Sequence, residues 1–161
     1  MFDLRAVMSK GGQEFMRNLM RKFTQGLMLL ACLQVSAWAS EKDLTTLTGQ
    51  PLHEQLVRTA MAFDVFNQRC RGVSASTQES QANRLFVEKY RMTLNNFVRE
   101  MMPMDARQLE ADIRSRINQR IFELGGCQKA RADGMEAQFK ADFRILMEKA
   151  QQSPWYPMPT R

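Results

Sequence analysis

The sequence predicts an all-α protein: an antiparallel, up-down-up-down four-helix bundle cross-linked by one disulfide and preceded by an N-terminal signal peptide. Apolar residues recur every three or four positions in four long segments, and no segment alternates with the period of a strand. Two cysteines, Cys70 and Cys127, lie near the end of the first segment and the start of the fourth. A chain of 161 residues has room for one domain.

Residues 1–39 have the pattern of a secretory signal peptide, and we expect it to be cleaved. Arg17, Arg21 and Lys22 form a basic region, residues 26–35 are apolar, and a small-x-small site ends at Ala39. The apolar run is shorter than the roughly 20 residues that a membrane-spanning helix needs, so we expect no transmembrane span. The mature chain would begin at Ser40, in the periplasm or outside the cell.

Two alternatives concern the same segment. Residues 1–15 are an unusual preface to a signal peptide, so the true start of translation could be Met16. Residues 29–32 (Leu-Leu-Ala-Cys) loosely resemble a bacterial lipobox, in which Cys32 would be acylated and become the mature N-terminus. Lipid anchoring at Cys32 is therefore the alternative to simple cleavage.

The mature chain begins with a polar stretch, residues 40–50, which we expect to be a flexible arm. The first helix should start near Pro51 and end at Arg71, because Gly72 can adopt the left-handed conformation that terminates a helix. A second, strongly apolar helix is expected over residues 79–101, followed by the helix-breaking Pro103.

The third and fourth helices are expected over residues 105–124 and 128–151. Asp105 can accept hydrogen bonds from the first free amides of the third helix, and two glycines follow its end. Gly134 weakens the first half of the fourth helix. The bundle thus spans residues 51–152, and the proline-rich tail, residues 153–161, is expected to be extended.

The predicted topology also predicts the disulfide. In an up-down-up-down arrangement, the end of the first helix and the start of the fourth lie at the same end of the bundle. Cys70 and Cys127 occupy these two places, and no other cysteine remains after removal of residues 1–39. In an exported protein we expect them to form a disulfide rather than two free thiols.

The residue types needed for catalysis or for a zinc or haem site are missing or stand alone. The single histidine, His53, is expected on the surface of the first helix, and no cysteine pair has the short spacing of a zinc or haem motif. Met101, Met102 and Met104 could bind Cu(I), but they are better explained as core residues around a turn. We therefore expect no cofactor and no enzymatic activity.

The charge pattern does not indicate nucleic-acid binding. Half of the formal net charge of +6 lies in residues 1–39, which leaves a mildly basic mature chain. Arg114, Arg116 and Arg120 make the third helix its most basic part, but acidic residues alternate with them. Glu110 and Asp112 stand four positions before Arg114 and Arg116, so we expect ion pairs along this helix.

The aromatic tail is the first candidate for a contact with another protein. Trp155 and Tyr156 lie between prolines, outside any predicted helix. They either fold back onto the bundle or bind a partner, and a proline-stiffened segment loses little conformational entropy on docking. The basic side of the third helix, with Arg114, Arg116 and Arg120, is the second choice.

These observations predict an exported helical interaction module, such as an adaptor, a chaperone or an envelope assembly factor, that binds another envelope protein. The disulfide frame, with a cysteine ending the first helix and another opening the last, resembles that of the pilotins, which escort outer-membrane secretins of type II secretion. The resemblance covers this frame alone and implies a secretin escort as an alternative function. A methionine-based Cu(I) or ligand-binding protein is the other alternative, and the oligomeric state stays open.

Overall fold

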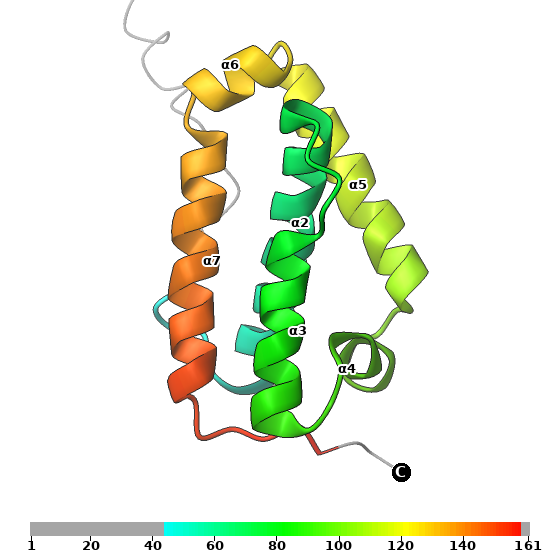
Figure 1. The fold of residues 1–161 in the computed structure, drawn as a ribbon, viewed down its shortest axis with the longest axis vertical. Coiled ribbons are helices and arrows are strands. Elements are labelled where there is room, and N and C mark those ends of the chain that lie inside the picture. The colour runs from blue at the N-terminus through cyan, green and yellow to red at the C-terminus, as the bar shows by residue number, and fades with distance from the viewer. Residues whose placement is uncertain (1–43, 159–161) are drawn as a thin grey trace, which may run out of the picture. The chain divides into compact units, whose positions relative to one another are not determined.

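The computed structural model describes residues 44–158, and this part of the chain consists of helices and connections, without strands. Six helices follow one another (Figure 1): α2 (Gly49–Arg71), α3 (Thr77–Tyr90), α4 (Leu94–Met101), α5 (Ala106–Glu123), α6 (Cys127–Ala132) and α7 (Met135–Gln152).

Helix α2 is the centre of the fold. Its buried residues lie on nearly all sides of the helix from Leu52 to Asn67, whereas an ordinary surface helix buries only one stripe. The other long helices, α3, α5 and α7, all pack against it. In Figure 1, α3 and α7 run alongside α2, α5 leans away from it, and α6 crosses the end where α2 finishes.

Two of the four expected helices form as single helices. Helix α2 ends at Arg71, and Gly72 follows in the left-handed conformation with φ 66°. Helix α5 begins after Asp105, whose Oδ1 accepts from the amides of Arg107 and Gln108 at 2.8 and 2.9 Å. The capping residues named from the sequence are thus confirmed.

The expectation of one continuous helix over residues 79–101 is wrong, because the chain breaks into α3 and α4. Arg91 adopts a left-handed conformation, φ 55°, and ends α3. Thr93 then caps α4, its Oγ1 accepting from the amide of Asn96 at 3.2 Å, while Asn83 Oδ1 accepts from the amide of Leu94 at 2.9 Å. The turn lets Leu94, a buried residue, reach the same core as Tyr90.

The expected fourth helix, residues 128–151, is also divided. Gly134 has φ 85°, a conformation that ends α6 and that side-chain-bearing residues rarely adopt. Helix α7 then begins at Met135. The glycine that weakens the predicted helix is therefore the point at which the chain changes direction from α6 to α7 (Figure 1).

The described part of the predicted flexible arm, residues 44–50, packs on the helices. Leu47 is only 7% exposed and belongs to the main core, and the ammonium group of Lys149 donates to the backbone carbonyls of Leu44 and Thr45. The predicted signal peptide (residues 1–39), with the predicted alternatives at Cys32 and Met16, lies outside the described residues. None of the helices between residues 44 and 158 has the length and apolar character needed to cross a membrane.

The structure joins Cys70 and Cys127 in a disulfide, as expected, with 5.2 Å between their Cα atoms. The bond connects the end of α2 to the first residue of α6. A small second core lies beside it, formed by Phe66, Ile121 and Ala130. Covalent and apolar contacts together therefore fix α5 and α6 to the C-terminal end of α2.

We predict that reduction of this disulfide lowers the free energy of unfolding by about 4 kcal/mol. The two cysteines are 57 positions apart, and the estimate is the chain entropy that a cross-link of this length removes from the unfolded state. Denaturant titration of the oxidised and reduced protein measures it. The double variant Cys70→Ser/Cys127→Ser is the control, since reductant should not change its stability. Equal stability of the oxidised and reduced wild-type protein would contradict the prediction.

Candidate functional site

The start of the C-terminal tail is fixed by Lys89. The Nζ atom of this residue, in the last turn of α3, donates to the backbone carbonyls of Ala150, Gln151 and Ser153 at 2.8, 2.7 and 2.6 Å. The last carbonyls of a helix have no partner within the helix, and a cation beside them is favourable. Lys89 therefore ends α7 and directs the tail across the end of α3.

The tail is extended, and its side chains alternate between the core and the solvent. Trp155 packs on the core and Pro157 is buried, whereas Tyr156 is 51% and Met158 78% exposed. This alternation is the two-residue period of an extended chain. Trp155 and Pro157 are thus the inward positions of the tail, Met158 projects outward, and Tyr156 is half exposed.

Trp155 contacts the N-terminal end of α2. Its ring lies 4.6 Å from the ring of His53, centroid to centroid, and a Cβ atom at Gly49 would lie 3.6 Å from its Cδ1 atom. Tyr156 makes a second attachment, because its Oη donates to the backbone carbonyl of Tyr90 at 2.8 Å. The aromatic tail was expected either to fold back onto the bundle or to bind a partner. The structure places Trp155 on the helices. The contact of the tail with a partner stays a prediction.

A hollow of about 560 Å³ lies next to the tail. Its walls come from the first described residues, from the start of α2 and from the end of α7, and they include Leu47, Leu52, Lys149 and Trp155. The hollow is open to solvent and largely apolar. The tail, the end of α7 and the segment that precedes α2 thus form one continuous surface.

The expectation that His53 lies on the surface is wrong, because its side chain is fully buried. Its Nδ1 lies 2.7 Å from the backbone oxygen of Gly49, which can only accept, so Nδ1 carries the proton. Its Nε2 lies 2.6 Å from Tyr90 Oη and accepts from it, and Ala150 O lies 3.2 Å from the same hydroxyl. A second stripe at helical spacing would have located this residue in the sequence: His53, Val57, Ala60, Asp64 and Asn67, all buried.

Burial explains the protonation of this pair. Loss of hydration lowers the pKa of His53 below its usual value, and the charge of Lys89 lowers it further, against the opposing hydrogen bond to Gly49. Burial raises the pKa of Tyr90 to about 12. His53 is therefore a neutral, structural residue without access to a substrate.

Polar residues at the other end of α2 also serve the fold. The carboxylate of Asp64 accepts from the amides of Gln78 and Glu79 at 3.2 and 2.8 Å and so caps α3. Burial raises the pKa of Asp64, against these amide hydrogen bonds. Burial also raises the pKa of Glu79, with a further increase from the charge of Asp64.

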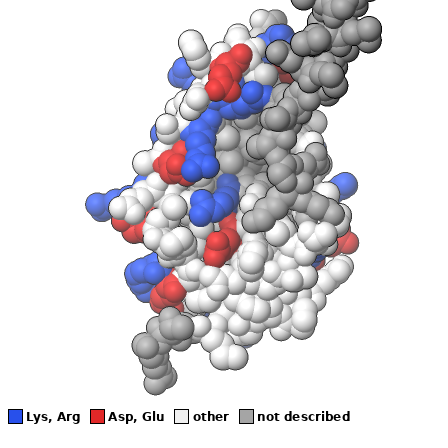
Figure 2. Space-filling model, turned by 180° about the vertical axis from the view of Figure 1, so that it is seen from behind, with Lys and Arg blue, Asp and Glu red and all other residues white. Residues whose placement is uncertain are grey.

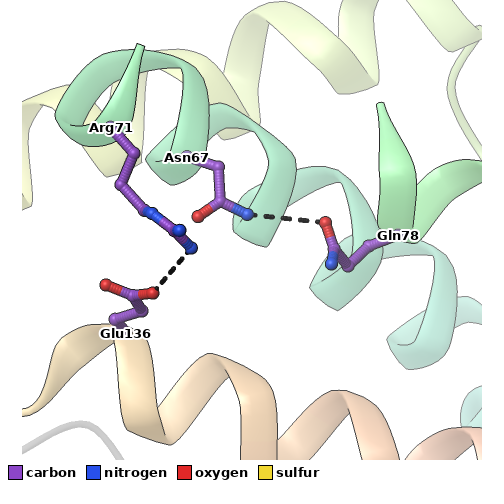
Figure 3. Close-up of polar contacts among 4 residues, drawn as sticks. All are labelled: Asn67, Arg71, Gln78 and Glu136. Carbon is purple, nitrogen blue, oxygen red and sulfur yellow. Dashed lines mark hydrogen bonds and ion pairs between the residues drawn. The ribbon is translucent and has the colours of Figure 1, made fainter. Parts of the chain in front are cut away.

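The last turn of α2 makes two more polar contacts, with different elements (Figure 3). Asn67 Nδ2 lies 3.5 Å from Gln78 Oε1, at the start of α3, and Arg71 forms a 2.9 Å ion pair with Glu136, at the start of α7. The Oδ1 atom of Asn67 is buried without a hydrogen-bond partner. These contacts connect the last turn of α2 to the starts of α3 and α7.

The expected ion pairs of the third helix are confirmed on α5. Arg114 pairs with Glu110 at 2.8 Å, and Arg116 pairs with Asp112 at 2.9 Å. Arg120 pairs with Glu123 at 3.3 Å. Basic and acidic side chains alternate along this side of the molecule in Figure 2, so the three arginines do not form a surface of one sign.

The three methionines lie around the turn between α4 and α5. Met102 is 7% exposed in the main core, and Met101 and Met104 are partly buried against it. The backbone carbonyl of Met101 accepts from Gln50 Nε2 at 2.6 Å, which attaches the turn to α2. Core packing accounts for all three positions.

Phe122, which the sequence pattern did not indicate as a site, is the most exposed of the large apolar side chains between residues 44 and 158, at 84%. A hollow of about 480 Å³ lies beside it, next to the disulfide. The apolar stripe of this helix includes Ile117, Ile121 and Leu124, and Phe122 falls outside it. That departure from the helical pattern is the signal that could have identified it.

In comparisons with known proteins, no family model, no curated protein and no solved structure matches this chain. Within residues 44–158, no three His, Cys, Asp or Glu side chains gather in a way that could hold a metal ion. Among the described residues, the tail and the neighbourhood of Phe122 carry exposed aromatic rings, and we take these two surfaces as the candidate functional sites.

We predict that His53 makes the stability of the protein depend on pH. The pKa of His53 in the folded protein is below its usual value of 6.5. At a pH between the folded-state pKa and 6.5, the unfolded chain therefore binds a proton that the folded protein does not. The contribution of His53 to the free energy of unfolding should therefore be complete above pH 6.5. It should decrease as the pH falls below 6.5, by up to about 1.4 kcal/mol per pH unit.

Urea denaturation at a series of pH values on both sides of 6.5 measures this dependence. The variant His53→Gln is the control, because the difference between the two curves removes the contributions of Asp64 and Glu79, whose raised pKa values act in the opposite direction. Parallel curves for the wild-type protein and the variant would show that His53 does not contribute.

Proposed function

We propose that the protein is an exported helical interaction module, in the class of adaptors, chaperones and envelope assembly factors, and that its tail contacts another envelope protein. The observation that carries the proposal is the alternation in the tail: Trp155 and Pro157 pack on the helices, whereas Met158 is 78% exposed and Tyr156 keeps half of its surface exposed while its hydroxyl donates to Tyr90. An attached tail has already lost much of its conformational freedom, so binding costs less entropy.

The disulfide supports the export part of this proposal. Disulfides persist in oxidising compartments and are rare in the cytosol, and the chain carries a signal-like pattern before Ser40. The proposed architecture is an antiparallel four-helix arrangement in which α3 with α4, and α6 with α7, each take the place of one long helix. Cys70 and Cys127 at one end of α2 support it.

The described side chains favour binding over catalysis. The one histidine is buried and neutral, and the carboxylates of Asp64, Glu110 and Asp112 cap a helix or pair with arginines. The exposed arginines of α5, Arg114 and Arg116, remain the second candidate contact. A pilotin-like secretin escort is a specific form of the same proposal, supported by the disulfide frame alone.

The export part predicts a mature N-terminus at Ser40. The basic, apolar and small-residue pattern that ends at Ala39 is a substrate for signal peptidase. Intact-mass spectrometry of the protein from the exported fraction measures the cleavage. An intact chain, or a mature N-terminus at an acylated Cys32, would contradict this prediction.

The binding part predicts that the exposed tail side chains touch the partner. A photo-reactive phenylalanine analogue at position 156 or 158 should cross-link to one envelope protein when the chain is expressed in its own compartment. The same analogue in place of Glu148, an exposed residue of α7, is the matched control and should give no such product.

A second variant distinguishes attachment of the tail from contact with the partner. Trp155→Ala should lower the melting temperature and reduce the cross-link, since it removes the contact with His53 and Gly49. Met158→Ala should leave the melting temperature unchanged and still weaken partner binding. Absence of cross-links at both tail positions, or equal products from position 148, would show that the tail is only part of the fold.

A further inference from the structure

Phe122 lies at the opposite end of α2 from the tail. Helix α5 buries Leu109, Ile113 and Ile121, and the ring of Phe122, one position after Ile121, points away from that core and is 84% exposed. Trp155 contacts Gly49 at the start of α2, whereas Arg69, beside Phe122, lies in its last turn. At 1.5 Å per residue, the two surfaces are separated by about 30 Å.

The hollow beside Phe122 lies between the end of α2, the end of α5 and the start of α6. It measures about 480 Å³ and is lined by Arg69, Asn118, Ile121, Phe122, Gly125, Gly126 and Cys127. Gly125 and Gly126 have φ values of 88° and 103°. The space beside both glycines is open, since no atom lies within 4 Å of a Cβ placed at either. The disulfide attaches Cys127 to α2 and so fixes this wall. The hollow has the size of a pocket for large side chains.

The charge around this hollow is basic. Lys129 pairs with Asp133, Arg71 with Glu136, and Arg120 with Glu123. Arg69 and Arg131, both exposed, make no ion pair with an acidic side chain anywhere in residues 44–158, while no carboxylate lines the hollow. A ligand for this surface is therefore expected to bring its own negative charge.

We propose that Phe122, the hollow and Arg69 form a second docking site, for an acidic segment of a partner protein that carries a bulky apolar side chain. The apolar side chain fills the hollow against the Phe122 ring, and a neighbouring carboxylate pairs with Arg69. Aromatic and arginine side chains together are typical of the residues that dominate binding energy at interfaces. A second copy of this chain fits less well, because the same surface of that copy carries Arg69 and no carboxylate among the residues that line the hollow.

This site is independent of the proposed tail contact and would let one molecule bind two segments at its two ends. A phage-displayed library of random heptapeptides, selected on the oxidised protein, tests it. We expect the enriched peptides to carry Asp or Glu beside Phe, Leu or Trp. Their binding should fall about tenfold or more in Phe122→Ala and in Arg69→Glu, since loss of a dominant interface side chain costs at least this factor.

Matched variants control for general effects on the surface. Val87→Ala removes another exposed apolar side chain, and Arg144→Glu makes the same charge change on α7; neither should weaken binding. Phe122 is exposed, so the melting temperature of Phe122→Ala should equal that of the wild-type protein. Enriched peptides without acidic residues, peptides that bind Phe122→Ala equally well, or no enrichment at all would overturn the proposal. Dimerisation in sedimentation experiments that Phe122→Ala abolishes would also overturn it, in favour of a second copy.

Discussion

Burial of α2 on nearly all sides is the constraint on which the rest of the structure depends. A helix surrounded by α3, α5 and α7 has little solvent for its polar side chains, so each must find a partner in the protein. His53 contacts Tyr90 of α3, and Asp64 caps the start of the same helix. These contacts fix both the distance and the register between α2 and α3, which apolar packing alone specifies less strictly.

Burial also explains which parts of the fold could be predicted from the sequence. The ends of α2 and α5 follow local rules, because Gly72 and Asp105 act on the nearest turn of their own helix. The break after Tyr90 was missed because Arg91 is not a residue type associated with a left-handed conformation. The conformational cost of Arg91 in this conformation is offset by contacts distant in sequence, such as the hydrogen bond that the amide of Leu94 donates to Asn83 Oδ1. Thr93 gave a local capping signal, but the apolar pattern continued through it.

The candidate sites show the same division between local pattern and tertiary context. The sequence identified Trp155 and Tyr156 as unusual, but only the packing against Gly49 distinguishes the attached ring from the exposed one. His53 was assigned to the wrong face because one stripe was traced along α2, and a helix surrounded by others has more than one. Phe122 was detectable as an apolar residue outside the stripe, whereas the hollow beside it depends on the disulfide and could not be derived from spacing.

The disulfide has a further consequence for how the protein matures. The chain has three cysteines, and one of them, Cys32, lies in the segment expected to be removed. A mature chain that starts at Ser40 therefore has a single possible intramolecular pairing, whereas four cysteines would allow three. Its oxidative folding needs an electron acceptor but no enzyme that reshuffles wrong disulfides. Retention of Cys32 would change this, since three thiols allow three different pairs, and removal of the leader before oxidation would then protect the correct bond.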